Sequence, residues 1–221
     1  ENATAVNRGT ITLTSTQNSK ENYGMISAGG ERAQIDNDGI INLNGYDYAA
    51  SKEVGYGMSI GDGRANNNNT ININRMYGYG MASTEGTLTN NGTINLTNGG
   101  YGIMGESGES FNNKDATITI TGTPNMQNSY GMSMQDGTAK NFGQIDVTGG
   151  SVNSETYGIS VNGGNGLNHG LINMHSDNAF GLFDEGDGEI TNVAGGTINL
   201  YGNNSVGMQT TSGKAEKFRH D

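Results

Sequence analysis

The stretch Asn90-Asn91-Gly92-Thr93-Ile94-Asn95-Leu96, followed by Tyr101-Gly102-Ile103, decides the fold, because the rest of the chain repeats it. A short segment with an isoleucine at its centre recurs eight times, at intervals of 30, 30, 23, 24, 27, 27 and 26 residues. A period of about 20–50 residues indicates stacked structural units. The central residues are Ile11, Ile41, Ile71, Ile94, Ile118, Ile145, Ile172 and Ile198.

A glycine, preceded by an aromatic residue in seven of the eight copies, marks a second segment of each repeat, as in Tyr23-Gly24-Met25. The aromatic position is Phe180 in the seventh copy and is replaced by Val206 in the eighth. Glycine at this place is expected to serve a positive φ or a close approach of the backbone. The glycines are Gly24, Gly57, Gly80, Gly102, Gly131, Gly158, Gly181 and Gly207.

The two halves of the repeat differ in how much their length varies. The aromatic position and the next isoleucine are 15 to 18 residues apart, whereas 7 to 15 residues separate each isoleucine from the following aromatic position. One variable corner in an otherwise constant repeat is typical of a solenoid. The sequence therefore predicts an all-β, single-stranded parallel β-helix of about eight coils, with three short strands in each coil.

Strand alternation predicts the core and the polar ladders. Within Thr93–Leu96, Ile94 and Leu96 should point inward and Asn95 outward, because successive side chains face opposite sides of a strand. Asparagines recur two positions after a small or aliphatic residue. Their side chains should form hydrogen bonds with the equivalent asparagines on the coils above and below. This pattern includes Ala5-x-Asn7, Leu88-x-Asn90, Phe111-x-Asn113 and Ala139-x-Asn141, and is irregular near Leu167-Asn168.

Composition excludes several classes of protein. The 221 residues include 38 Gly and a single Pro, which disfavours a helical protein. A net charge of −11 argues against a nucleic-acid partner, because binding would require clustered Lys and Arg. The absence of cysteine excludes disulfides and thiolate metal sites, and no apolar run approaches the roughly 20 residues that span a bilayer.

The longest insertion at the variable corner is the best candidate for a binding loop. It covers residues 44–55 and carries two tyrosines beside charged side chains. Insertions at such a corner leave the stacked core unchanged, so specificity can reside there. The candidate binding residues are Tyr46, Asp47, Tyr48, Lys52 and Glu53.

Catalytic and metal sites find little support in the sequence. Weak candidates for calcium ligands are Asp184, Asp187 and Glu189, although a solvated acidic turn explains them more simply. His169 and His175 flank one strand without a repeated partner, so we expect no metal site, no cofactor and no enzyme activity. The tyrosines allow two interpretations: they point inward with the methionines, or a bulge at glycine makes them an exposed stripe.

The repeats resemble the passenger repeats of type V autotransporters, especially the large fusobacterial surface adhesins. The resemblance rests on units such as Asn90–Leu96 with Tyr101-Gly102-Ile103 and covers essentially the whole chain. It implies an extracellular passenger that a C-terminal barrel displays on a Gram-negative outer membrane and that attaches to glycans or proteins of host or bacterial surfaces.

Residues 1–221 are expected to form one β-helical segment of a longer passenger, with a ninth coil beginning near residue 214. The alternative to an adhesin is a β-helical polysaccharide lyase or tailspike-type depolymerase. That alternative would use the acids between Asp184 and Glu189.

Overall fold

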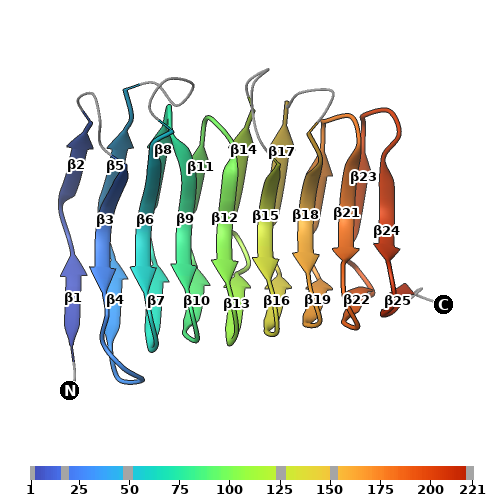
Figure 1. Cartoon of the computed structure of the whole chain (residues 1–221), viewed down its shortest axis with the longest axis horizontal. Helices are drawn as coiled ribbons and strands as arrows, with labels where there is room; N and C mark the ends of the chain where they lie inside the picture. Colours follow the sequence, from blue (N-terminus) through green and yellow to red (C-terminus); the bar gives the residue numbers. More distant parts are fainter. Residues whose placement is uncertain (1–2, 16–19, 47–51, 123–127, 150–153, 218–221) are drawn as a thin grey trace.

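A computed structural model describes residues 3–15, 20–46, 52–122, 128–149 and 154–217. The described chain consists of 25 strands in three parallel sheets, which run side by side along an elongated rod (Figure 1). No helix long and apolar enough to cross a membrane occurs in the described ranges. The prediction of an all-β solenoid with three strands per coil is confirmed.

The first and second strands of the coils form sheets of nine and eight strands. The nine-stranded sheet contains β1 (Thr4–Asn7), β4 (Gln34–Asn37), β7 (Arg64–Asn67), β10 (Thr87–Asn90), β13 (Glu109–Asn112), β16 (Thr138–Asn141), β19 (Asn165–Asn168), β22 (Glu189–Asn192) and β25 (Lys214–Lys217). The next sheet contains β2 (Thr10–Thr14), β5 (Ile40–Asn44), β8 (Thr70–Asn74), β11 (Thr93–Leu96), β14 (Thr117–Thr121), β17 (Gln144–Thr148), β20 (Leu171–Met174) and β23 (Thr197–Leu200).

The third strands of the coils form the other eight-stranded sheet, which carries the aromatic-glycine motifs. It contains β3 (Glu21–Ser27), β6 (Val54–Ile60), β9 (Tyr77–Ser83), β12 (Gly100–Gly105), β15 (Ser129–Met134), β18 (Thr156–Val161), β21 (Ala179–Asp184) and β24 (Val206–Thr210).

The central isoleucines stack in register through the whole rod. Ile94 pairs with Ile71 on one side and with Ile118 on the other, and all three are fully buried. At the two ends, Ile11 and Ile198 are only partly buried. Adjacent strands lie about 4.8 Å apart, so each isoleucine contacts its own equivalents and the core is continuous from coil to coil.

A second ladder of buried asparagines closes the corner between the first two sheets. Each side chain donates from Nδ2 to Oδ1 of the next over 2.8–2.9 Å, for example Asn90 to Asn112. The ladder supplies partners for amides that would otherwise be buried without hydrogen bonds. Its members are Asn7, Asn37, Asn67, Asn90, Asn112, Asn141, Asn168 and Asn192.

The prediction that Asn113 belongs to this ladder was wrong. Ser110 takes the inward place on β13, so the alternation turns Phe111 outward and buries Asn112 in register with Asn141. Asn113 instead donates to Asn91 on the exposed side of the turn, over 2.6 Å. The copy that looked irregular in sequence is regular in space, because Asn168 bonds on to Asn192 over 2.8 Å.

The recurring glycine of the third sheet is required by close packing. At Gly102 an added Cβ atom would lie 2.3 Å from Cγ2 of Ile118 and 2.5 Å from the carbonyl oxygen of Gly131. None of the eight glycines has a positive φ. Of the two expected reasons for glycine, close approach is therefore the one that applies.

Candidate functional site

The aromatic residues of the third sheet form one outward-facing row, and the alternation of the strand changes at glycine to place them there. On β12, Tyr101 and Met104 are half-buried, while the adjacent Gly102 and Ile103 are both buried. Two successive inward residues return the following side chain to the outside, as in a bulge. Of the two interpretations that the sequence left open, the structure has the outward-facing stripe, although its rings are half-buried and Tyr157 is buried.

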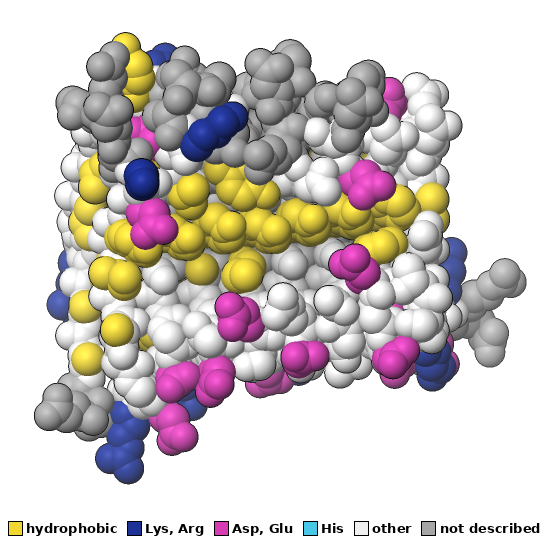
Figure 2. Space-filling view, viewed as in Figure 1, with side chains coloured by type: hydrophobic (Ala, Val, Ile, Leu, Met, Phe, Trp, Pro, Cys, Tyr) yellow, Lys and Arg dark blue, Asp and Glu magenta, His cyan; other side chains and the backbone are white. Residues whose placement is uncertain are grey.

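Seven rings stack face to face in this row, which we call the tyrosine stripe. Neighbouring ring centroids are 4.5–5.3 Å apart and the ring planes differ by 2–14°. Figure 2 shows the stripe as a hydrophobic band along the length of the rod, with acidic side chains beside both of its ends. The rings are Tyr23, Tyr56, Tyr79, Tyr101, Tyr130, Tyr157 and Phe180.

Two more rings lie against the stripe in a different orientation. Tyr77 meets Tyr79 and Tyr101 edge to face, at 76° and 84°. On the last coils Phe183 is tilted by 52° against Tyr157 and by 57° against Phe180. The faces of the stripe rings are covered by one another, so the stripe offers ring edges and hydroxyl groups to its surroundings.

Burial raises the pKa values of five stripe phenols, those of Tyr23, Tyr56, Tyr101, Tyr130 and Tyr157. The Tyr157 hydroxyl donates to Glu155 over 2.5 Å, and burial followed by this hydrogen bond raises its pKa well above the usual value. Burial, with the hydrogen bond to Glu21, raises the pKa of Tyr23 to about 12. The stripe is therefore a neutral row of phenols at physiological pH.

A slot of about 160 Å³ lies directly beside the stripe, on the face of β12, β15, β18 and β21. The edges of Tyr101, Tyr130 and Tyr157 form one wall, and Ser133 and Ser160 lie in the outward row next to them. The slot exists because these serines are small, whereas Met104 and Phe183 occupy the same row on the flanking coils. Its remaining lining includes Gln135, Asn162 and Glu185.

The predicted binding loop is only partly described. Asp47 and Tyr48 lie outside the described residues, and Lys52 is exposed. Tyr46 is 50% exposed, while Glu53 is fully buried. The Glu53 carboxylate accepts hydrogen bonds from the Ser15 hydroxyl and, over 2.8 Å, from the Tyr46 backbone N–H, so it joins the loop to the first coil.

The acidic segment near the C-terminus does not gather its carboxylates. Asp184 is fully buried and accepts from the Gly186 N–H at 3.1 Å and the Thr210 hydroxyl at 2.9 Å. Oε1 of Glu189 lies 3.6 Å from Nζ of Lys214, so this carboxylate forms an ion pair. Within the described ranges, no three or more His, Cys, Asp or Glu side chains are grouped so that they could hold a metal ion, Asp187 included.

The histidines stack on aromatic neighbours in place of approaching each other. His169 lies 4.6 Å from Phe142, centroid to centroid, and His175 lies 4.4 Å from Tyr201. Both pairs join equivalent turns of adjacent coils, so they extend the stacking that holds the rod together.

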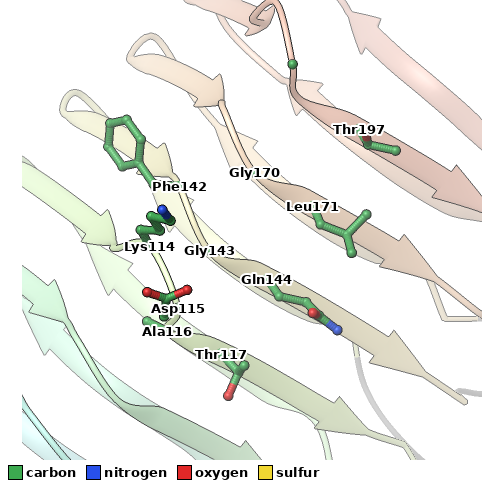
Figure 3. A pocket seen from close by; sticks show the side chains of 11 residues that line it. Lys114, Asp115, Ala116, Thr117, Phe142, Gly143, Gln144, Gly170, Leu171 and Thr197 are labelled. Carbon is green, nitrogen blue, oxygen red and sulfur yellow. The ribbon is translucent and has the colours of Figure 1, made fainter.

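A second recess lies at the corner between the first two sheets (Figure 3). The turns that follow β16 and β19 have two residues each, whereas the turns on either side, after β13 and β22, have four. The longer turns form walls, and the row Thr117, Gln144, Leu171 and Thr197 forms the floor. Phe142 projects at its edge and is 38% exposed.

No protein-family model, no curated protein and no solved structure matches this chain. The fold and its surface define a β-solenoid with an outward-facing, largely half-buried aromatic stripe. The sequence predicted the stripe as one of two possible arrangements of the tyrosines, but it did not predict the slot. The signal was present in the residue three positions after each aromatic position, where Ser133 and Ser160 stand between Met104 and Phe183.

Proposed function

We propose that this β-solenoid is an adhesive rod that attaches to molecules of a cell surface through the tyrosine stripe. The observation that carries the proposal is the stripe itself, a row of seven stacked rings about 29 Å long at strand spacing. Tyrosine supplies a large, rigid, amphipathic contact area at a small loss of conformational entropy. The rings are half-buried apart from the buried Tyr157, but they form one contiguous aromatic band, and contiguous apolar surface marks interaction sites.

The rigidity of the rod supports this role. The five inner rings of the stripe are held between aromatic equivalents on the coils above and below, so little conformational freedom remains to be lost when a partner binds. The same proposal includes display of the rod as a passenger on a Gram-negative outer membrane and kinship with autotransporter adhesins. The coil architecture and the repeat pattern support them.

A binding role is favoured over glycan cleavage by the positions of the acids. Hydrolysis of a glycosidic bond uses, in most families of glycoside hydrolases, two carboxyl groups on either side of one cleft. The best sequence candidate, Asp184, is buried and engaged in structural hydrogen bonds. The stripe, in contrast, offers contact area without a reacting group.

The test is retention of the fluorescently labelled protein on fixed epithelial cells and on a panel of bacteria, read by flow cytometry. Ser133→Arg places a bulky side chain beside the stripe without removing a stacked ring. It is expected to reduce retention at least tenfold. The matched control is Thr119→Arg, at an outward and half-buried position of the second sheet. The proposal is contradicted if neither cells nor bacteria retain the unmodified protein, or if the two variants reduce retention equally.

A further inference from the structure

The tyrosine stripe presents ring edges, and ring edges have a specific partner. The hydrogen-bearing edge of an aromatic ring is electropositive and its face is electronegative, so a ring edge prefers to meet the face of another ring. A stack of parallel rings therefore offers a flat array of edges to any ring that lies along it.

Two aromatic side chains of the protein itself already pack against these ring edges. Tyr77 meets two stripe rings edge to face on one side, with centroids 5.8 and 6.0 Å from those of Tyr79 and Tyr101. Phe183 lies 5.2 Å from Tyr157 and 5.1 Å from Phe180, inclined to both. Because Phe183 belongs to the same outward row as Ser133 and Ser160, an aromatic side chain of this row packs against the stripe where one is present.

The slot beside Tyr101, Tyr130 and Tyr157 is the part of this row where small side chains leave the edges of Tyr101 and Tyr130 partly uncovered, whereas Tyr157 is buried at its far end. Its volume of about 160 Å³ equals the room that about five waters take in the liquid. Polar groups line it beside the ring edges, namely the serine hydroxyls, the amides of Gln135 and Asn162 and the Glu185 carboxylate. An acceptor at this place suits a ring that carries an N–H donor.

We infer that the slot binds an indole ring, presented as a tryptophan side chain by a protein partner. The indole lies with its face against the edges of Tyr101 and Tyr130, and its N–H faces the polar lining. Glycans fit the stripe less well, because sugar rings stack on aromatic faces and these faces are covered. The inference rests on the proposed adhesive function and specifies the chemistry of its partner.

The chain contains no tryptophan, so indole fluorescence reports the added probe alone. The probe is N-acetyl-tryptophanamide, titrated with the whole protein and excited at the red edge of the indole band. A ligand of this size is expected to bind with a Kd on the order of 1 mM. The same titration by NMR with N-acetyl-leucinamide measures an apolar side chain that lacks an aromatic face, and binding at least tenfold weaker is expected.

Two substitutions in one row separate the slot from the rest of the stripe. Ser160→Leu fills the slot and is expected to weaken the binding of N-acetyl-tryptophanamide at least tenfold. Ser59→Leu introduces the same change in the same row of half-buried serines but outside the slot, and is expected to leave the Kd within twofold. Circular dichroism confirms that both variants are folded.

The inference is overturned if the leucine and tryptophan amides bind equally, or if both serine variants weaken binding to the same extent. Competition of maltohexaose for the probe would overturn it in favour of a saccharide site. Retention on cells distinguishes this failure from that of the proposed function. Retention that needs the stripe, without probe binding, refutes only the indole site, whereas probe binding without retention refutes only the adhesive role.

Discussion

The Tyr157 hydroxyl donates a hydrogen bond to Glu155 over 2.5 Å, at the point where the tyrosine stripe meets its acidic surroundings. The phenol is therefore held neutral beside a carboxylate that is exposed to solvent. At the opposite end of the stripe, Tyr23 donates to Glu21 over 2.9 Å. The first ring of the stripe and the ring next to its last, Phe180, thus each donate to a carboxylate.

The raised pKa values of the phenols predict that the rod loses stability at alkaline pH. Unfolded tyrosines release their protons near pH 10, whereas burial holds the pKa of Tyr23 at about 12 and raises those of Tyr101 and Tyr157. Above about pH 10 the unfolded state therefore binds fewer protons than the folded state, so the free energy of unfolding falls as the pH rises. Below about pH 10 these tyrosines do not make the free energy of unfolding depend on pH.

Parallel titrations by circular dichroism and by phenolate absorbance measure this effect. We expect most phenolate absorbance to develop together with the loss of β structure, and Tyr101→Phe to move both changes to higher pH. Complete ionisation of all tyrosines near pH 10 with the fold intact would contradict the account.

Gly102→Ala is expected to destabilise the rod by about 1–3 kcal/mol, as for an overpacked core. The new methyl group would overlap Cγ2 of Ile118 and the carbonyl oxygen of Gly131. Gly207→Ala is the matched control, because the equivalent Cβ atom on the last coil has no atom within 4 Å. Its effect should stay within about 0.5 kcal/mol. Equal urea midpoints for the two variants would show that close packing is not the reason for the glycine.

Asn90→Ala removes one member of the buried asparagine ladder and is expected to cost about 2–4 kcal/mol. The side chain of Asn67 loses its acceptor and that of Asn112 loses its donor, and both remain buried. Asn91→Ala interrupts the exposed ladder beside it and should change the free energy of unfolding by less than about 1 kcal/mol. Urea unfolding of the two variants decides the matter, and a similar small effect of both would refute the structural role of the buried ladder.

Glu53→Ala is expected to lower stability without affecting retention on cells. The buried carboxylate accepts from Ser15 and from the Tyr46 backbone, and its loss removes both hydrogen bonds, at about 1–3 kcal/mol. Glu109→Ala, which removes a half-exposed ion pair with Lys140, should cost less than about 1 kcal/mol. A variant of Glu53 that is stable but no longer retained would return the binding role to the loop.

Sequence alone identified the coil because stacking requires the same residue type at the same place in every repeat. The isoleucine positions from Ile11 to Ile198 pair with one another in the order of the repeats. The error at Asn113 arose where two neighbouring asparagines offered the same spacing and only the pairing of β13 with β16 selects Asn112.

The binding surface was harder to predict for a physical reason. Simple alternation places Tyr101 and Ile103 on the same face, and only the packing of Gly102 against Ile118 turns two successive residues inward. The slot depends on Ser133 and Ser160, which have no chemical signature apart from the larger residues beside them. Glu53 looked like a contact residue because sequence does not show that its carboxylate is buried.

The most direct test of the central claim is photo-crosslinking on intact cells with p-benzoylphenylalanine at one position of each of two sheets. Position 59 lies beside the stripe but outside the slot, and position 119 is an equally half-buried, outward place on the second sheet. We expect a discrete crosslinked product from position 59 on cells that retain the protein, and none from position 119. Equal crosslinking from both positions, or crosslinking from position 119 alone, would contradict the tyrosine stripe as the binding surface.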